Sequence, residues 1–210
     1  MAGALPGWVA PDHLTWLALA AAIVGGVAYL ATAWSLDWLW LASAMLVLHW
    51  WGDSLDGTLA RVRDIRRERY GLYVDHQCDA VSALALLGGL GASPLMEVEI
   101  ALGLVIALFL VMLLVGFVAI ARDVFKISFA GVGPTEARIL LIGFNTVIWA
   151  LDNPAFALLG LRLTLFDLLG LAGIAGLVVT YAVASLIERK KLSELDPPRA
   201  GRNGDGPPAS

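Results

Sequence analysis

Four aspartates stand close together in a part of the chain that is otherwise strongly apolar: Asp53, Asp56, Asp75 and Asp79. On a helix, Asp53 and Asp56 are three residues apart and share a face, as do Asp75 and Asp79, which are four residues apart. A charge near the centre of a membrane helix costs about 2.5–3.5 kcal/mol, and clustered carboxylates also repel one another. Because divalent cations remove both costs, we expect a metal site here.

The ligand set predicts Mg²⁺ or Mn²⁺ rather than Zn²⁺, because hard carboxylate oxygens occur without a Cys or His cluster. Four carboxylates on two helices are enough for two ions, and two-metal sites serve in-line displacement at phosphorus. Gly57 and Ala60 have small side chains or none, so a ligand can approach the backbone of the helix beside the first aspartate pair. Arg61 adds a planar fork suited to a pyrophosphate. These residues favour a metal-dependent enzyme with a phosphate-bearing substrate.

Other interpretations of the same residues stay open at this level. A D-x-x-D spacing alone is common, and aspartates on membrane helices also serve cation or proton pathways. The "DSLDG" stretch lacks the ligand spacing and the closing Glu of an EF-hand. For the other arginines of the basic loop, an interpretation as cytoplasmic anchors is favoured; they are Arg63, Arg66, Arg67 and Arg69.

Composition places these residues in an integral membrane protein. Of 210 residues, 59% are apolar and 15% charged, whereas soluble domains average about 45–50% and about 25%. The mean hydropathy is +0.79. The single cysteine, Cys78, excludes an internal disulfide, and we interpret it as a small buried residue.

Six apolar stretches have lengths near the ~20 residues that a bilayer requires. They span about 14–33, 38–60, 72–92, 98–121, 135–151 and 163–187. We therefore expect an all-α membrane domain of six transmembrane helices over residues 1–191. The second and third helices, joined by a short loop, are expected to be antiparallel neighbours whose acidic ends face each other. Residues 192–210 are rich in Pro, Gly and charge and predict a disordered cytoplasmic tail.

The distribution of basic residues predicts the orientation. Lys and Arg gather in the 61–70 loop, around the end of the fourth stretch and after the sixth. The positive-inside rule then puts both termini and the aspartates at the cytoplasmic face, in what we expect to be a prokaryotic cytoplasmic membrane. Residues 1–13 contain no Lys or Arg and the first apolar run is long, so we expect a transmembrane helix there rather than a signal peptide.

The aspartate spacing resembles the signature of the CDP-alcohol phosphotransferase family, D-x-x-D-G-x-x-A-R followed by G-x-x-x-D-x-x-x-D. All eight fixed positions match: Asp53, Asp56, Gly57, Ala60, Arg61, Gly71, Asp75 and Asp79. Nine residues separate Arg61 from Gly71, one more than the usual eight, and the extra residue falls in the loop. The "PDHLT", "DHQCD" and "GPTEAR" segments are also similar to family members, so the resemblance covers about residues 8–190.

This resemblance implies an enzyme of phospholipid biosynthesis that moves a substituted phosphate group from a CDP-alcohol to an acceptor hydroxyl, releases CMP and uses two divalent metals. It implies roles for the matched residues: Asp53, Asp56 and Asp75 as metal ligands, Asp79 as ligand and general base, and Gly57, Ala60, Arg61 and Gly71 at the CDP site. Expected partners are a CDP-alcohol donor and an alcohol acceptor, at least one of them a lipid, membrane lipids, and a second copy in a homodimer. No nucleic-acid polymer is expected.

The substrates stay open: the donor is CDP-diacylglycerol or a CDP-aminoalcohol. A membrane prenyltransferase and a cation transporter are the alternative functions, and CMP release separates all three.

Several residues keep two interpretations each. His49 and His76 either support the aspartates or pack, Glu136 and Arg138 either contact the acceptor or cap a helix, and the basic set Arg122, Lys126 and Arg138 either binds an anionic acceptor or marks a cytoplasmic loop.

Overall fold

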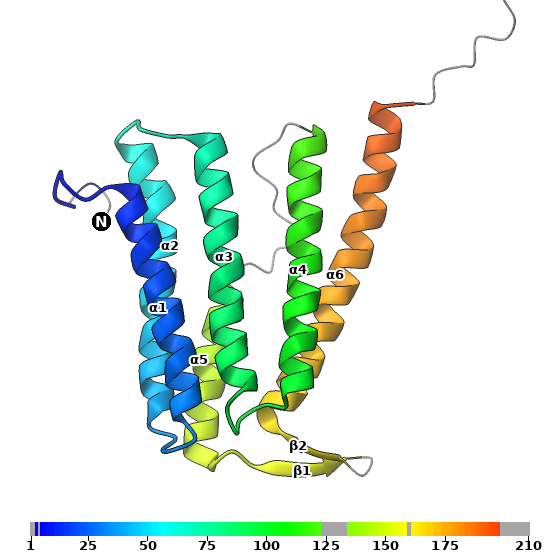
Figure 1. Cartoon of the computed structure of the whole chain (residues 1–210). Helices are drawn as coiled ribbons and strands as arrows, with labels where there is room; N and C mark the ends of the chain where they lie inside the picture. The colour runs from blue at the N-terminus through cyan, green and yellow to red at the C-terminus, as the bar shows by residue number, and fades with distance from the viewer. Residues whose placement is uncertain (1–2, 4, 123–133, 159–160, 198–210) are drawn as a thin grey trace, which may run out of the picture.

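Six helices and one short hairpin make up the parts of the chain that the computed structural model describes, residues 3, 5–122, 134–158 and 161–197. The helices are α1 (Pro11–Ala31), α2 (Trp38–Val62), α3 (Glu68–Gly91), α4 (Val98–Arg122), α5 (Pro134–Leu151) and α6 (Leu165–Leu195). They lie side by side with their connections at two ends (Figure 1). The all-helical architecture predicted from the apolar stretches is confirmed, because each stretch lies largely within one of these helices.

A hairpin between α5 and α6 was not predicted. Its strands, β1 (Ala155–Leu158) and β2 (Leu161–Thr164), pair antiparallel. Each strand has only four residues: the first, AFAL, is entirely apolar, and the second, LRLT, alternates over the shortest length at which alternation indicates a strand. Thr164 ends the hairpin and starts α6 with a capping box, in which its hydroxyl accepts a hydrogen bond from the Asp167 amide at 3.1 Å.

The helix α6 continues to Leu195, so residues 192–195 of the expected tail are helical. Residues 198–210 lie outside the described part of the chain.

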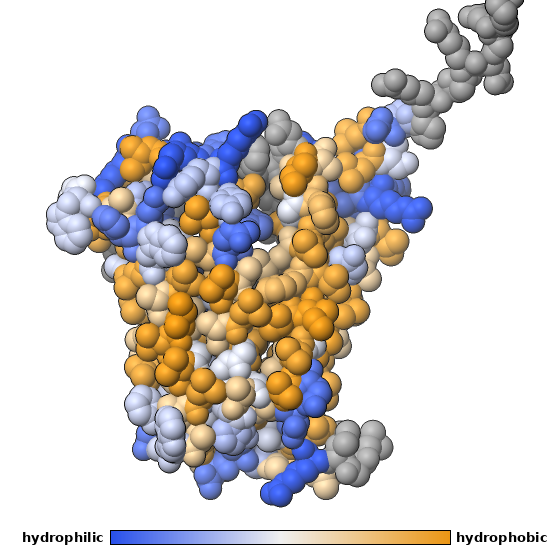
Figure 2. Space-filling view, in the orientation of Figure 1, coloured by the Kyte–Doolittle hydropathy of each residue, from blue (hydrophilic) through white to orange (hydrophobic). Residues whose placement is uncertain are grey.

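Apolar surface is arranged as a membrane protein requires. By length and composition, α1, α4 and α6 are able to cross a membrane, and α5 carries a shorter apolar stretch, Ala137–Leu151. Figure 2 shows apolar residues over the middle of one face, with hydrophilic residues gathered at both ends. Several apolar helices thus fit an integral membrane protein.

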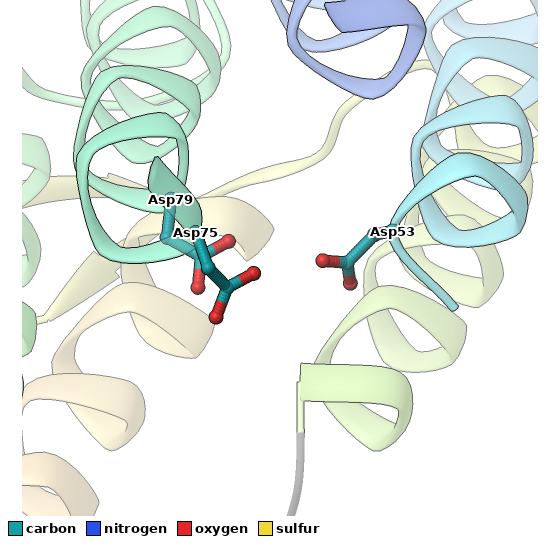
Figure 3. A group of neighbouring side chains, drawn as sticks. All are labelled: Asp53, Asp75 and Asp79. Atoms are coloured by element: carbon teal, nitrogen blue, oxygen red, sulfur yellow. The ribbon is translucent and has the colours of Figure 1, made fainter. Parts of the chain in front are cut away.

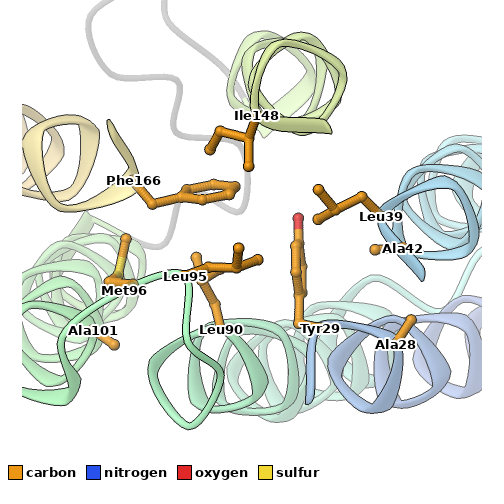
Figure 4. Packing of buried hydrophobic residues seen from close by; sticks show 10 residues of the cluster. All are labelled: Ala28, Tyr29, Leu39, Ala42, Leu90, Leu95, Met96, Ala101, Ile148 and Phe166. Atoms are coloured by element: carbon orange, nitrogen blue, oxygen red, sulfur yellow. The ribbon is translucent and has the colours of Figure 1, made fainter. Parts of the chain in front are cut away.

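The main buried core lies at the end of the bundle opposite the aspartates. Ten residues from all six helices and the α3–α4 connection form it (Figure 4): Ala28, Tyr29, Leu39, Ala42, Leu90, Leu95, Met96, Ala101, Ile148 and Phe166. The Tyr29 ring meets Phe166 edge-on, with ring centroids 6.3 Å apart. The helices therefore pack together around this core at one end of the bundle. The aspartates of α2 and α3 lie farther toward the opposite end.

Small residues let α1 pack tightly against both aspartate-bearing helices. A Cβ at Gly26 of α1 would overlap the carbonyl oxygen of Ala85 in α3, and a Cβ at Gly89 of α3 would overlap the Gly26 carbonyl. On α2, a Cβ at Gly52 would lie 2.9 Å from the carbonyl oxygen of Leu14. Close backbone approach through small residues is typical of membrane helix pairs. Here it brings α1 into close contact with both helices that carry the aspartates.

Candidate metal and substrate site

Three of the four aspartates come together between α2 and α3. One carboxylate oxygen from each of Asp53, Asp75 and Asp79 lies within 4.8 Å of the others. Figure 3 shows Asp53 facing the two aspartates of α3 across the space between the helices. Asp75 and Asp79 share a face because they are one helical turn apart. We call these three residues the carboxylate cluster.

The carboxylate cluster fits a divalent metal ion by the chemistry of its donors. It offers only carboxylate oxygens, the ligands that Mg²⁺ and Mn²⁺ prefer. Three carboxylates this close repel one another, and a bound cation relieves that repulsion. The structure thus brings together three of the four predicted ligands in a group that could hold a divalent ion, and the four-ligand site stays a prediction.

Asp56 lies outside the cluster and is tied to α1 instead. Its Oδ2 accepts a hydrogen bond from the Thr15 hydroxyl at 2.7 Å, and its Oδ1 accepts one from the Gly57 amide. No role for Thr15 was predicted. The signal was present in the "PDHLT" segment, which places this hydroxyl in the second turn of α1.

The residues predicted for the nucleotide divide into two groups. Ala60 and Gly71 line a pocket of about 290 Å³ between the start of α1, the end of α2 and the start of α3, together with Ala10, Pro11, Asp12, Ile65, Arg67 and Tyr70. Gly57 and Arg61 are exposed and are not among the pocket's lining residues. The Arg61 guanidinium donates a hydrogen bond to the Thr58 hydroxyl at 3.1 Å. At both Gly57 and Gly71 the space that a side chain would fill is open.

Arg67, predicted to be a cytoplasmic anchor, also contacts other residues of the protein. It forms an ion pair with Asp12 at 3.0 Å and lies over the Tyr70 ring, 3.8 Å from its centroid. The Tyr70 hydroxyl also donates to Asp12, at 3.3 Å. These three residues join the start of α1 to the start of α3 along one wall of the pocket.

Arg63 also binds protein rather than only facing the membrane surface. Its guanidinium donates to the backbone carbonyls of Leu5 at 3.0 Å and Pro6 at 2.9 Å, and to that of Val9. It thereby holds the segment before α1 against the end of α2. Arg66 and Arg69 are exposed, as expected of surface anchors.

Arg138 reaches the carboxylate cluster from α5. Its Nη2 lies 2.9 Å from Oδ2 of Asp53, and only 12% of its side chain is exposed. This contact joins Arg138 to an aspartate of the cluster rather than to the end of its own helix. The predicted contact of Arg138 with the acceptor stays a prediction. The side chain of Glu136 lies outside the described residues.

The two histidines near the aspartates do not hydrogen-bond to them within the described part of the chain. His76 Nδ1 contacts the carbonyl oxygen of Leu72, at 3.0 Å. His49 is buried, and its Nδ1 has no hydrogen-bond partner among the described residues.

Arg122 is paired with the buried Glu188 of α6 at 3.0 Å. This ion pair links α4 to α6. It gives Arg122, which was considered for binding an anionic acceptor, a partner within the protein. Lys126 lies outside the described residues.

Comparison with known proteins gives a family and a fold. The family model described as CDP-alcohol phosphatidyltransferase matches residues 8–185. A crystal structure of Mycobacterium tuberculosis phosphatidylinositol phosphate synthase with CDP-DAG bound has a TM-score of 0.55 and 19% sequence identity, over 92% of this chain and 93% of that chain. At this identity the likeness shows the fold. A search of curated proteins finds no match.

Proposed function

The chain belongs to the CDP-alcohol phosphatidyltransferase family and is a phosphotransferase, and from this premise we propose that it transfers a phosphatidyl group from CDP-diacylglycerol to the hydroxyl of a small alcohol. The choice of a lipid donor is supported by the CDP-DAG bound to the structural neighbour. The family match favours this chemistry over the two alternatives considered from the sequence, prenyl transfer and cation transport.

The observation that carries the proposal is the convergence of Asp53, Asp75 and Asp79 from two helices. A group of oxygen ligands is suited to a hard divalent cation, which would neutralise the pyrophosphate and stabilise CMP as it leaves. Residues around the cluster would bind the donor, and a member of the cluster would accept the proton of the acceptor hydroxyl.

In the proposed reaction, the acceptor oxygen forms a bond to the phosphorus that carries the lipid, and the P–O bond to CMP breaks. The acceptor hydroxyl must lose its proton in this step. Asp79 is the proposed general base, because it lies in the cluster and is half-buried on the helix face shared with Asp75. Its carboxylate would take the proton while CMP leaves with the electrons of the broken bond.

The nucleotide is proposed to lie along the end of α2 and the start of α3. The pocket lined by Ala60 and Gly71 has a volume of about 290 Å³, close to the lower end of the range for ligand pockets, about 300 Å³. The open space at Gly57 and Gly71 allows a ligand close to the backbone. We propose that Arg61 turns from Thr58 to the pyrophosphate, which its planar fork matches.

We retain two ions in the proposal, with Asp56 as the ligand that the second ion requires. Asp56 follows Asp53 by three residues on α2 and shares its helix face, and its Oδ2 is engaged by Thr15. The carboxylate cluster by itself has ligands suited to one ion. Counting the Mn²⁺ ions bound per chain separates a one-ion site from a two-ion site.

The decisive experiment measures CMP release by the purified protein with a panel of radiolabelled CDP-alcohols and candidate acceptors. We expect release with CDP-diacylglycerol, its loss in EDTA, and its return with Mg²⁺ or Mn²⁺. Full activity after exhaustive chelation would contradict the metal site. Release only with CDP-aminoalcohols and diacylglycerol would keep the family chemistry and reverse the choice of donor.

A further inference from the structure

The ion pair between Arg138 and Asp53 brings a third helix and a fixed positive charge to the carboxylate cluster. Arg138 stands in the second turn of α5, and its Nη2 lies 2.9 Å from Oδ2 of Asp53. Its side chain is 12% exposed and that of Asp53 is 25% exposed. Because water is largely excluded from the guanidinium, its charge acts on nearby groups with little screening.

A metal ion bound by the carboxylate cluster would share Asp53 with this guanidinium. The three carboxylates carry up to three negative charges, and Arg138 offsets one of them. A divalent cation arriving at the same carboxylates is attracted by them and repelled by Arg138. The pyrophosphate of the proposed donor adds negative charge beside the same ion, so the donor compensates for the charge of Arg138.

We infer that Arg138 couples metal binding to donor binding: it weakens the hold of the carboxylate cluster on a cation alone and favours the cation together with an anionic donor. This inference rests on the proposed function, because it takes the cluster as the metal site. Arg138 acts here through Asp53 and through its charge, and it is a positioning residue rather than a catalytic one. The coupling is reciprocal, so the metal must strengthen donor binding by the same factor.

Arg138 also has an opposite effect, since its ion pair restricts the rotamers of Asp53 and prepares that carboxylate for the metal. Fixing one short side chain changes an affinity only a few-fold. Two like charges separated by a few ångströms in a poorly solvated site interact more strongly than that. Removal of the charge should therefore tighten metal binding despite the loss of orientation.

The test is a calorimetric titration of Mn²⁺ into the full-length protein in detergent, with and without cytidine diphosphate. Arg138→Gln and Arg138→Met remove the charge, and the second keeps a long apolar stem for packing. Arg138→Lys keeps the charge. Arg162→Gln is the matched control, because it removes one arginine from the exposed hairpin at the opposite end of the bundle.

We expect Mn²⁺ alone to bind at least about tenfold more tightly to both uncharged variants than to the wild type. Cytidine diphosphate should strengthen Mn²⁺ binding less in these variants than in the wild type. The Lys variant and the Arg162→Gln control should stay within about threefold of the wild type, since they preserve the charge at position 138.

Equal or weaker Mn²⁺ binding by both uncharged variants would overturn the inference and leave the proposed metal site intact. Tighter binding of Mn²⁺ with an unchanged effect of cytidine diphosphate would also overturn it. If the wild-type protein binds no Mn²⁺, the metal site of the proposed function fails as well, so the two failures are distinguishable.

Discussion

Asp53 and Asp79 belong to the same carboxylate cluster but have different surroundings. Both are half-buried, but Asp53 forms an ion pair with Arg138, whereas Asp79 lies one helical turn after Asp75 on the opposite helix. The guanidinium engages Oδ2 of Asp53, so this oxygen is less available to an acceptor hydroxyl. At the scale of single residues, this difference supports a binding role for Asp53 and a proton-accepting role for Asp79.

Asp79→Asn should abolish CMP release while leaving the binding of cytidine diphosphate measurable. Loss of a general base alone lowers turnover by about 10²–10⁴-fold, and the amide is also a poorer metal ligand. CMP release and nucleotide calorimetry on the same preparation check this, with Asp53→Asn as a comparison that should impair binding too. Wild-type turnover in Asp79→Asn would show that the base is another group.

Arg61→Ala should weaken the binding of cytidine diphosphate by about 1.5–3 kcal/mol, the range for a hydrogen bond to a charged group. Arg61 follows Gly57 by one helical turn and is exposed, so it is free to turn toward a ligand. Calorimetric titration of the alanine variant measures the loss. Lysine at this position should restore binding only in part, because it lacks the planar fork.

The matched control for Arg61 is Arg66→Ala, which removes an exposed arginine from the loop after α2. It should change binding by much less. If both variants lose the same affinity, a diffuse basic surface holds the nucleotide and the assignment of Arg61 is wrong.

At the scale of elements, α1 is the support on which the site depends. It packs on α2 through Gly52 and on α3 through Gly26 and Gly89, and its Thr15 holds Asp56. A polar network also joins α1 to α2 and α5: the Tyr29 hydroxyl donates to Asn145 at 3.2 Å, and Asn145 donates to Ser43 at 3.0 Å. A change of the α1–α3 separation should therefore alter the site at a distance.

The adjacent glycines Gly88 and Gly89 provide a matched test of this support. A Cβ at Gly89 would overlap the backbone of α1, whereas Gly88 has open space. Gly89→Ala should destabilise the protein by about 1–3 kcal/mol through overpacking. Gly88→Ala should be neutral or stabilising by up to about 1 kcal/mol, because alanine favours the helix.

Thermal unfolding in detergent measures both variants, and each kcal/mol corresponds to about 2–4 °C for a chain of this size. Gly89→Ala should also lower CMP release, since it forces α3 away from α1 and changes the distance between the aspartates. If the two alanine variants melt at the same temperature, the close α1–α3 contact does not contribute to stability.

At the scale of the whole molecule, apolar surface lies between two hydrophilic ends (Figure 2). The α2–α3 connection and the hairpin lie at opposite ends of the bundle (Figure 1). The distribution of basic residues predicts that the end with the α2–α3 connection faces the cytoplasm.

We predict that a cysteine at position 66 is protected in intact cells and that a cysteine at position 162 is labelled by a membrane-impermeant maleimide. Both arginines at these positions are exposed, one in the α2–α3 connection and one in the hairpin. The changes are made on Cys78→Ser, which removes the chain's single native thiol. The reverse labelling pattern would invert the proposed orientation.

The helices and the family could be predicted from the order of the residues. The six helices follow from apolar stretches of bilayer length, and the family follows from a spacing of aspartates that has meaning only on helices. The apolar stretches and the aspartate spacing are local features, because hydrophobicity and helical periodicity can be read within a single segment. The pairing of Asp53 with the two aspartates of α3 was also predictable, because the two helices are consecutive and antiparallel.

The contacts that α1 and α5 make with the aspartates depend on how the helices pack. Asp53 and Asp56 share a helix face, yet α5 supplies Arg138 to the first and α1 supplies Thr15 to the second. Arg138 stands 85 positions after Asp53 in the sequence, and a sequence pattern carries no information about such a contact. The contact depends on the packing of α1, α2, α3 and α5 around small residues and a common core, and packing is decided by the shapes of all these surfaces together.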